Sequence, residues 1–187
     1  MPEITGLLLA AGKSSRFGGQ KLLQLFRGLP LIYHSIASLS ACDRIVAVVR
    51  QQDESLQRLL REAGIDCVIN REAEQGMGNS IACGVRATDK SHAWCILPAD
   101  MPCVSESTTR QVVNQLHDGA PLTAPFYQGR RGHPVGFSRA FSEQLSALKG
   151  DAGARKILIS NADELVRIEI DDPGIFIDID TPQDLVS

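Results

Sequence analysis

The segment from residue 7 to residue 21 combines residue types that can bind a polyphosphate. Its apolar start, Leu7–Leu9, predicts the end of a buried strand, and glycines and cations follow at once. Because glycine has no Cβ atom, the backbone could approach phosphate oxygens closely, and the cations would supply the charge. An ordinary strand-to-helix turn with solvated cations is the alternative. The glycines are Gly12, Gly18 and Gly19, and the cations are Lys13, Arg16 and Lys21.

The spacing of this loop excludes the two commonest phosphate-binding motifs. A G-x-x-x-x-G-K-[ST] loop would include Gly12-Lys13-Ser14 only if residue 7 were a glycine, and that residue is Leu7. The dinucleotide motif G-x-G-x-x-G fails as well, since Ser14 and Phe17 occupy its second and third glycine positions. The loop is therefore of another kind.

A carboxylate follows another apolar run. Asp100 comes after Trp94–Leu97 and lies between Pro98 and Pro102, which restrict the backbone on both sides. Mg²⁺ prefers one or two carboxylates together with water and substrate phosphate oxygens, so Asp100 is a candidate Mg²⁺ ligand. The alternative is a helix cap or an Asx turn before a helix near Ser105.

Three other polar segments lie where strands end or helices begin. Asp178 and Asp180 are further carboxylates, although Asp180-Thr181-Pro182 is also typical of a helix start. Gly76–Ser80 could hold a base or ribose through its amides, or could simply cap a helix. The segment 150–155 contains a Gly-Asp pair that could mark only a helix start.

The segment 125–134 interrupts the pattern of strands and helices. It is too rich in turn residues for a helix and predicts a loop or an irregular hairpin, beneath which a ligand could lie. His133, in this segment, is the histidine that we single out for a role in a site. Arg130 and Arg131 either bind a phosphate of the ligand or are solvated.

Elements of alternating type must position these residues. Apolar, β-branched runs alternate with helix-like stretches, which predicts a mostly parallel central sheet flanked by helices on both faces, an α/β fold. In such a sheet the ligand lies beyond the carboxyl ends of the strands. The predicted strands are 4–9, 45–49, 66–69, 93–97, 122–124 and 165–170, and the predicted helices are 31–39, 54–63, 79–88, 105–116, 138–148 and 152–159.

Composition limits the classes of protein to consider. A chain of 187 residues with 43% hydrophobic and 22% charged residues predicts one soluble domain, residues 1–187. The absence of a long apolar run or a signal-like start predicts no membrane contact and a cytoplasmic location. Five cysteines without a C-x-x-C pair argue against disulfides and a zinc site. A net charge of −3 argues against nucleic-acid binding.

Taken together, these motifs resemble the molybdenum cofactor nucleotidyltransferase family, and within it the cytidylyltransferase branch. The resemblance covers almost the whole chain. Its motifs are Leu9–Lys21, Gly76-Met77-Gly78-Asn79-Ser80, Pro98-Ala99-Asp100-Met101-Pro102, Gly132-His133-Pro134, Gly150-Asp151-Ala152-Gly153-Ala154-Arg155 and Asp178-Ile179-Asp180-Thr181-Pro182. It implies a single Rossmann-like nucleotidyltransferase domain.

The same resemblance implies a role for each group of residues. Lys21, Arg16 and Asp100 would be catalytic, and Asp100 with Asp180, or with Asp178, would bind Mg²⁺. The acceptor would contact Arg131, Gly132, His133 and Pro134. Residues implied to bind the nucleotide are Leu9, Ala10, Ala11, Gly12, Lys13, Arg16, Lys21, Gly76, Gly78, Asn79 and Ser80.

The activity that the resemblance implies is Mg²⁺-dependent transfer of CMP from CTP to the terminal phosphate of molybdopterin or the molybdenum cofactor, with release of pyrophosphate. Ala10-Ala11-Gly12 resembles the cytidylyl form, whereas the guanylyl branch has Ala-Gly-Gly there. Gln183 departs from the acidic residue frequent in the family. The alternatives are a cytidylyl- or guanylyltransferase with another phosphorylated acceptor, and a non-catalytic carrier. An apo-molybdoenzyme or its chaperone is a further partner to consider.

Overall fold

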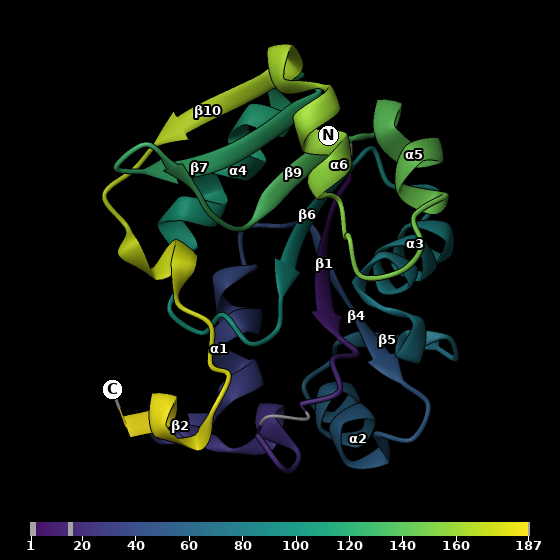
Figure 1. Ribbon diagram of the computed structural model, residues 1–187, viewed down its shortest axis with the longest axis vertical. Coiled ribbons are helices and arrows are strands. Elements are labelled where there is room, and N and C mark those ends of the chain that lie inside the picture. Colours follow the sequence, from purple (N-terminus) through teal and green to yellow (C-terminus); the bar gives the residue numbers. More distant parts are fainter. Residues whose placement is uncertain (1–2, 15–16, 187) are drawn as a thin grey trace.

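The strands of the protein form one large sheet and a small hairpin. The computed structural model describes residues 3–14 and 17–186. The large sheet has eight strands in the order β10-β7-β9-β6-β1-β4-β5, with β8 paired to β7 (Figure 1). Its strands are β1 (Ile4–Ala10), β4 (Arg44–Arg50), β5 (Asp66–Asn70), β6 (Ala93–Pro98), β7 (Leu122–Tyr127), β8 (Arg130–Arg131), β9 (Val135–Ser138) and β10 (Leu165–Glu169). The hairpin pairs β2 (Leu25–Phe26) with β3 (Leu29–Pro30).

The centre of the large sheet is parallel, as the alternation of strands and helices predicts. β1 pairs in parallel with β4 on one side and with β6 on the other, and β5 extends the sheet beyond β4. β9 runs antiparallel to both β6 and β7. The strands that follow β1 are thus added first on one side of it, as β4 and β5, and then on the other side, as β6. At such a switch in strand order, the crevice for a ligand is expected at the carboxyl ends of β1 and β6.

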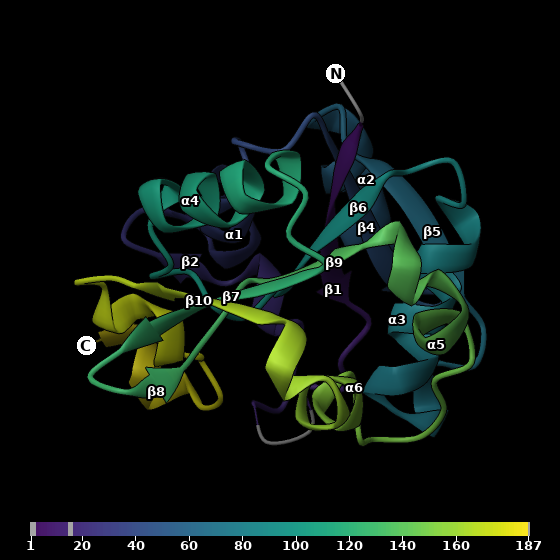
Figure 2. The ribbon, with the colours of Figure 1, turned by 90° about the horizontal axis from the view of Figure 1, so that it is seen from above.

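Helices cover both faces of the sheet, which confirms the predicted α/β architecture. One apolar cluster joins β1 to α1, α2 and α4, and a second joins the opposite face to α3, α5 and α6. Figure 2 shows α1 and α4 on one side of the sheet and α3, α5 and α6 on the other. The helices are α1 (Leu31–Ser38), α2 (Glu54–Glu62), α3 (Met77–Ala87), α4 (Glu106–His117), α5 (Ser142–Ser146) and α6 (Arg155–Ser160).

The helix predicted over residues 138–148 is confirmed only in part. The chain pairs as β9 up to Ser138, turns through the 3-10 helix Arg139–Phe141 and forms only the short α5. β9 fits between its neighbours because residue 136 is a glycine. A Cβ atom at this position would lie only 2.6 Å from Thr123 Cγ2 of β7. The helix predicted from residue 152 also begins later, at Arg155, since Gly150 and Gly153 have φ angles of +69° and +52°.

The predicted irregular hairpin over residues 125–134 is confirmed in part. β7 continues through Pro125 to Tyr127, and the turn Gln128–Gly129 returns the chain into β8. Both turn residues have positive φ angles. The chain then runs through His133 into β9.

The C-terminal segment runs back to the carboxyl end of β6. It contains the 3-10 helices Pro173–Phe176 and Pro182–Val186, and the Ile179 amide donates a 2.9 Å hydrogen bond to the Asp100 carbonyl. Ile179 is buried with Phe26 of the small hairpin and with Leu31. In Figure 1 this yellow segment runs down from β10, past α1, toward β2. Among the described residues, no helix has the length and apolar character needed to span a membrane.

Candidate active site

The carboxyl ends of β1 and β6 bring the glycine-containing loop next to Asp100. The Ala99 amide donates a hydrogen bond to the Leu9 carbonyl at 3.1 Å, and Ser35 Oγ of α1 donates one to the Ala99 carbonyl at 2.8 Å. The first bond continues the β1–β6 pairing past the end of the sheet, and the second ties this segment to α1. As a result, the backbone around Asp100 is fixed from two elements.

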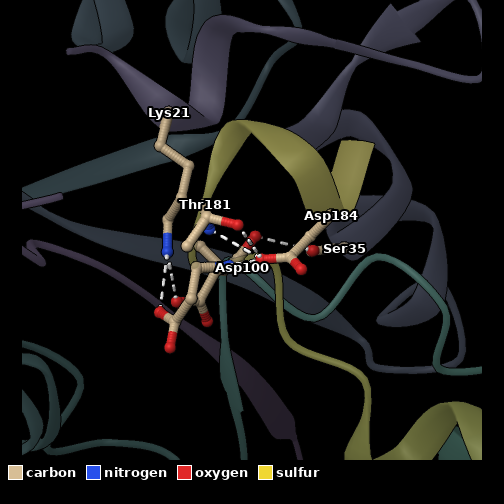
Figure 3. A network of polar contacts seen from close by, with 7 residues as sticks. Lys21, Ser35, Asp100, Thr181 and Asp184 are labelled. Atoms are coloured by element: carbon tan, nitrogen blue, oxygen red, sulfur yellow. Dashed lines mark hydrogen bonds and ion pairs between the residues drawn. The ribbon is translucent and has the colours of Figure 1, made fainter. Parts of the chain in front are cut away.

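Lys21 supplies a buried cation to this position. Its ammonium lies 2.7 Å from Asp100 Oδ2 and 3.8 Å from Asp180 Oδ1, and only 7% of the residue is exposed (Figure 3). Lys21 begins the 3-10 helix Lys21–Leu23, two residues after Gly19. The structure thus brings together three of the residues that the sequence singled out, although they lie far apart along the chain.

Asp184, a residue not predicted from the sequence, fixes the backbone that carries Asp180. Its Oδ2 accepts hydrogen bonds from the amides of Asp180 and Thr181 at 3.0 and 2.7 Å and from Thr181 Oγ1 at 2.9 Å (Figure 3). These amide and hydroxyl donors lower the pKa of the Asp184 carboxyl. The spacing Thr181-x-x-Asp184 is that of a capping box, and it could have revealed the contact. The helix start that the sequence offered as an alternative is therefore present, as the 3-10 helix Pro182–Val186, and the metal role of Asp180 stays a prediction.

The carboxylates at this site exceed the nearby positive charge. Burial and the negative charges of Asp180 and Asp100 raise the pKa of Asp178. No group of three or more His, Cys, Asp or Glu side chains suited to a metal is found within residues 3–14 and 17–186. Asp100 and Asp180 nevertheless fit a Mg²⁺ ion that takes its remaining ligands from water and phosphate oxygens, because Mg²⁺ needs only one or two carboxylates.

Two adjoining cavities open at this edge of the sheet. The first, of about 220 Å³, is lined by the Lys21, Asp100 and Asp180 group, and the second has a volume of about 360 Å³. They share Leu9, Gly12, Lys13 and Asp100. The second cavity is also lined by Ala11, Ala73, Glu74, Gly76, Met77, Ser80, Pro98 and Asp151.

Some residues predicted to bind the nucleotide have their side chains elsewhere. Ala10 is buried in the core on the α1 and α4 face. Asn79 is 7% exposed, and its amide group bonds Glu72, Gln75 and the Gly150 amide. Ser80, by contrast, lines the second cavity, and its Oγ accepts a hydrogen bond from Asn70. Arg16 lies outside the described residues, so its role stays a prediction.

Gly76 and Gly78 allow the start of α3 to lie against the segment 149–151. A Cβ atom on Gly76 would lie 2.3 Å from Asp151 Oδ1, and one on Gly78 would lie 2.9 Å from the Gly150 carbonyl oxygen. The Gly78 amide donates a 2.7 Å hydrogen bond to that same oxygen. Two motifs that the sequence presents separately are therefore in direct contact.

Lys13 forms an ion pair that local sequence patterns do not reveal. Its ammonium lies 2.5 Å from Glu74 Oε2, across the second cavity. The hydrogen bond from Lys13 lowers the pKa of Glu74. Because both side chains are about half exposed, the pair can exchange for other partners at little cost.

A third cavity, of about 230 Å³, lies on the other side of Met77. It shares Leu9, Met77 and Pro98 with the second cavity and includes Arg131 and His133. Burial, and secondarily the Arg131 charge, lower the pKa of His133 to about 4, so its ring is neutral near pH 7. Gly132 and Pro134, also predicted for the acceptor, are buried. A Cβ atom on Gly132 would lie 2.5 Å from the Ile175 side chain.

The fold and the site define an α/β enzyme that handles phosphorylated ligands beyond the carboxyl ends of a parallel sheet. Residues 6–165 match the family described as the MobA-like NTP transferase domain. The chain belongs to this family and is a nucleotidyltransferase. The predicted Rossmann-like nucleotidyltransferase fold is thereby confirmed.

Known proteins resemble the chain over nearly its whole length. It is 28% identical to the "Molybdenum cofactor cytidylyltransferase" of Escherichia coli, over 100% of this chain and 96% of the relative. It is 30% identical to the "Purine catabolism protein PucB" of Bacillus subtilis, over 98% and 94%. The crystal structure of Rv0371c from Mycobacterium tuberculosis covers 98% of this chain and 95% of its own, with a TM-score of 0.86 and 24% identity. The same protein has also been solved in complex with manganese, with a TM-score of 0.82 and 22% identity over 97% and 95% of the two chains.

Proposed function

We propose that the protein transfers CMP from CTP to the terminal phosphate of molybdopterin or its molybdenum form, releasing pyrophosphate in a Mg²⁺-dependent reaction. The observation that carries this proposal is the buried Lys21 ammonium between Asp100 and Asp180, at the edge of two adjoining cavities. A cation and a carboxylate pair in one place suit a reaction in which phosphate charge must be bound and redistributed.

The choice of nucleotide and acceptor rests on resemblance. Ala10-Ala11-Gly12 matches the cytidylyl form of the loop, and the Escherichia coli relative is named a molybdenum cofactor cytidylyltransferase. We assign the cytidine and ribose to the second cavity, between the loop and α3, and the triphosphate to the first, between Lys13 and Lys21. The acceptor then enters from the third cavity, which borders the second at Met77.

The reaction is an in-line displacement. An oxygen of the acceptor's terminal phosphate forms a bond to the α-phosphorus, and the bond from that phosphorus to the bridging oxygen breaks. Pyrophosphate leaves with the electron pair. A phosphate monoester is largely ionised near pH 7, so no strong general base is required of the protein. A divalent cation held by Asp100 and Asp180 would supply positive charge to the phosphate oxygens.

The residues of the chain contribute orientation and charge. Lys21 places its ammonium where negative charge develops on the α-phosphate, and the carboxylates hold it there. Lys13 exchanges its exposed partner Glu74 for phosphate oxygens. Asp184 acts as a positioning residue, since it fixes the backbone of Asp180 through two amide hydrogen bonds.

The test is pyrophosphate release by the purified protein with Mg²⁺ and molybdopterin, comparing CTP, GTP, ATP and UTP. We expect release with CTP and its loss in Asp100→Asn, which keeps the size of the side chain but removes its charge. Glu106→Gln, on the exposed start of α4, is the matched control. Release with GTP alone would move the protein to the guanylyl branch, and binding without release from any nucleotide would favour a carrier.

A further inference from the structure

The lining of the third cavity does not match that of a nucleotide site. Its wall is mostly apolar, and no carboxylate lines it. The neutral imidazole of His133 is the one uncharged polar side chain among its lining residues. The apolar side chains that line it include Leu9, Ile81, Ile96, Val135, Phe137 and Leu158.

Two arginines from separate elements lie at this cavity. Arg131 belongs to β8, and Arg155 is the first residue of α6. Burial and the charge of Arg155 lower the pKa of Arg131. The Nη1 atom of Arg131 is buried without a hydrogen-bond partner, and neither arginine pairs with a carboxylate in the described part of the chain. The repulsion between the two guanidinium groups is therefore not offset by the protein.

The charge of Arg155 does not stabilise the helix that it begins, α6. A cation in the first turn is unfavourable, because the amide groups there already carry partial positive charge. The preceding loop nevertheless brings Arg155 to the cavity through left-handed turns at Gly150 and Gly153. The Asn79 side chain holds the loop by accepting a 2.8 Å hydrogen bond from the Gly150 amide. Locally unfavourable charges that the fold holds in place are typical of ligand sites.

We propose that Arg155 and Arg131 together bind an anionic group of the acceptor, whose uncharged ring system occupies the apolar third cavity. This inference rests on the proposed function, which identifies the ligand of this cavity as the acceptor. The two guanidinium groups complement the anion, and the apolar wall takes the ring system. His133 offers the ring system a neutral hydrogen-bonding partner. Arg155 thereby becomes a residue that selects acceptors carrying negative charge.

Direct binding tests the inference without any nucleotide. The probes are 6-hydroxymethylpterin and its phosphate monoester, followed by pterin fluorescence at constant ionic strength. We expect the monoester to bind the native protein about tenfold more tightly than the alcohol, since a charge-assisted contact contributes ~1.5 kcal/mol. Arg155→Gln should remove this preference, Arg155→Lys should retain part of it, and Lys156→Gln, on the neighbouring exposed residue, should not change it.

Each outcome of this experiment decides the inference. Equal binding of alcohol and monoester, binding of neither probe, or an unchanged preference in Arg155→Gln would overturn it. Arg155 is exposed, so its replacement should leave the fold intact, which circular dichroism checks. Arg155-dependent binding of the monoester together with no pyrophosphate release from any nucleotide would support the cavity assignment and remove the proposed transferase activity. The two failures are thus distinguishable.

Discussion

Lys21 links the buried part of the structure to the chemistry of the site. We expect Lys21→Ala to lower the rate of pyrophosphate release about a hundredfold to a thousandfold, as the loss of one preorganised charge donor does in other enzymes. The free energy of unfolding should fall by only about 1 kcal/mol, because Asp100 and Asp180 are 28% and 32% exposed and water can solvate them. Steady-state kinetics and urea unfolding separate the two effects. Lys90→Ala, on a distant exposed loop, is the control, and an unchanged rate in Lys21→Ala would remove the assigned role.

Asp184 makes a different contribution, through the geometry of Asp180. In Asp184→Ala, the amides of Asp180 and Thr181 lose their acceptor, so the Asp180 carboxylate is held less firmly. We expect the Mg²⁺ concentration for half-maximal activity to rise at least about tenfold, as the loss of a group that orients a metal ligand does elsewhere. Gln183→Ala is the neighbouring control. An Mg²⁺ titration that matches the native protein would show that Asp180 needs no such support.

The sequence predicted the residues of the site better than their partners. Asp100, Lys21 and Asp180 were identifiable because each follows a recognisable strand, loop or turn. The Lys13–Glu74 pair and the contact between Gly78 and Gly150 join residues far apart along the chain, and no local pattern encodes them. The side-chain hydrogen bonds of Asn79 were likewise hidden, although its position near the start of a helix was not.

At the scale of elements, α3 packs closely against the sheet at Gly84. A Cβ atom on Gly84 would lie 2.5 Å from Leu7 Cδ1 and 2.8 Å from Val48 Cγ2. Alanine favours a helix over glycine by about 1 kcal/mol, but overpacking a core costs about 1–3 kcal/mol. We expect the cost of overpacking to exceed the gain in helix propensity, so Gly84→Ala should lower the free energy of unfolding by about 1 kcal/mol. Urea unfolding measures this, and a stabilised variant would mean that α3 shifts freely.

The parallel centre of the sheet was predictable because short apolar, β-branched runs separated by helical stretches leave few other arrangements. The missed strand β9 has only four residues and takes its shape from pairing with β7, which closely precedes it, and with β6, which lies far away in the sequence. The early start predicted for α6 failed for a local reason, the left-handed glycines at 150 and 153. Long-range pairing and backbone conformation thus account for these errors.

At the scale of the whole molecule, the C-terminal segment connects the third cavity to the carboxylate site. The Ile175 carbonyl accepts a hydrogen bond from the His133 amide at 3.2 Å, and the Ile179 amide bonds the Asp100 carbonyl at 2.9 Å. Close contact between Ile175 and Gly132 fixes this arrangement further. The loop that carries His133 and the backbone of Asp100 are therefore held by one segment. A change in the charge of the His133 imidazole should thus affect the stability of the assembled site.

His133 should make the stability of the protein depend on pH. Burial and Arg131 lower its pKa to about 4, against contributions from Asp100 and the Ile96 carbonyl that raise it, whereas the unfolded value is near 6.5. Between these values the unfolded chain binds more protons, so the stabilisation is complete above pH 6.5 and is lost as the pH falls toward 4. The loss should reach about 3 kcal/mol.

Urea unfolding of the native protein and His133→Gln, at intervals from pH 8 to pH 4, measures this contribution as a difference. The lowered pKa values of Asp172 and Asp184 remove stability only nearer to their unfolded value of 3.8, and the raised pKa of Asp178 acts in the opposite direction. These carboxyl groups remain in both proteins, so their effects largely cancel. A titration of the His133 ring by NMR gives the folded pKa directly. Parallel pH profiles of the two proteins, or a ring that titrates near 6.5, would show that the imidazole is solvated and that the third cavity is open to water.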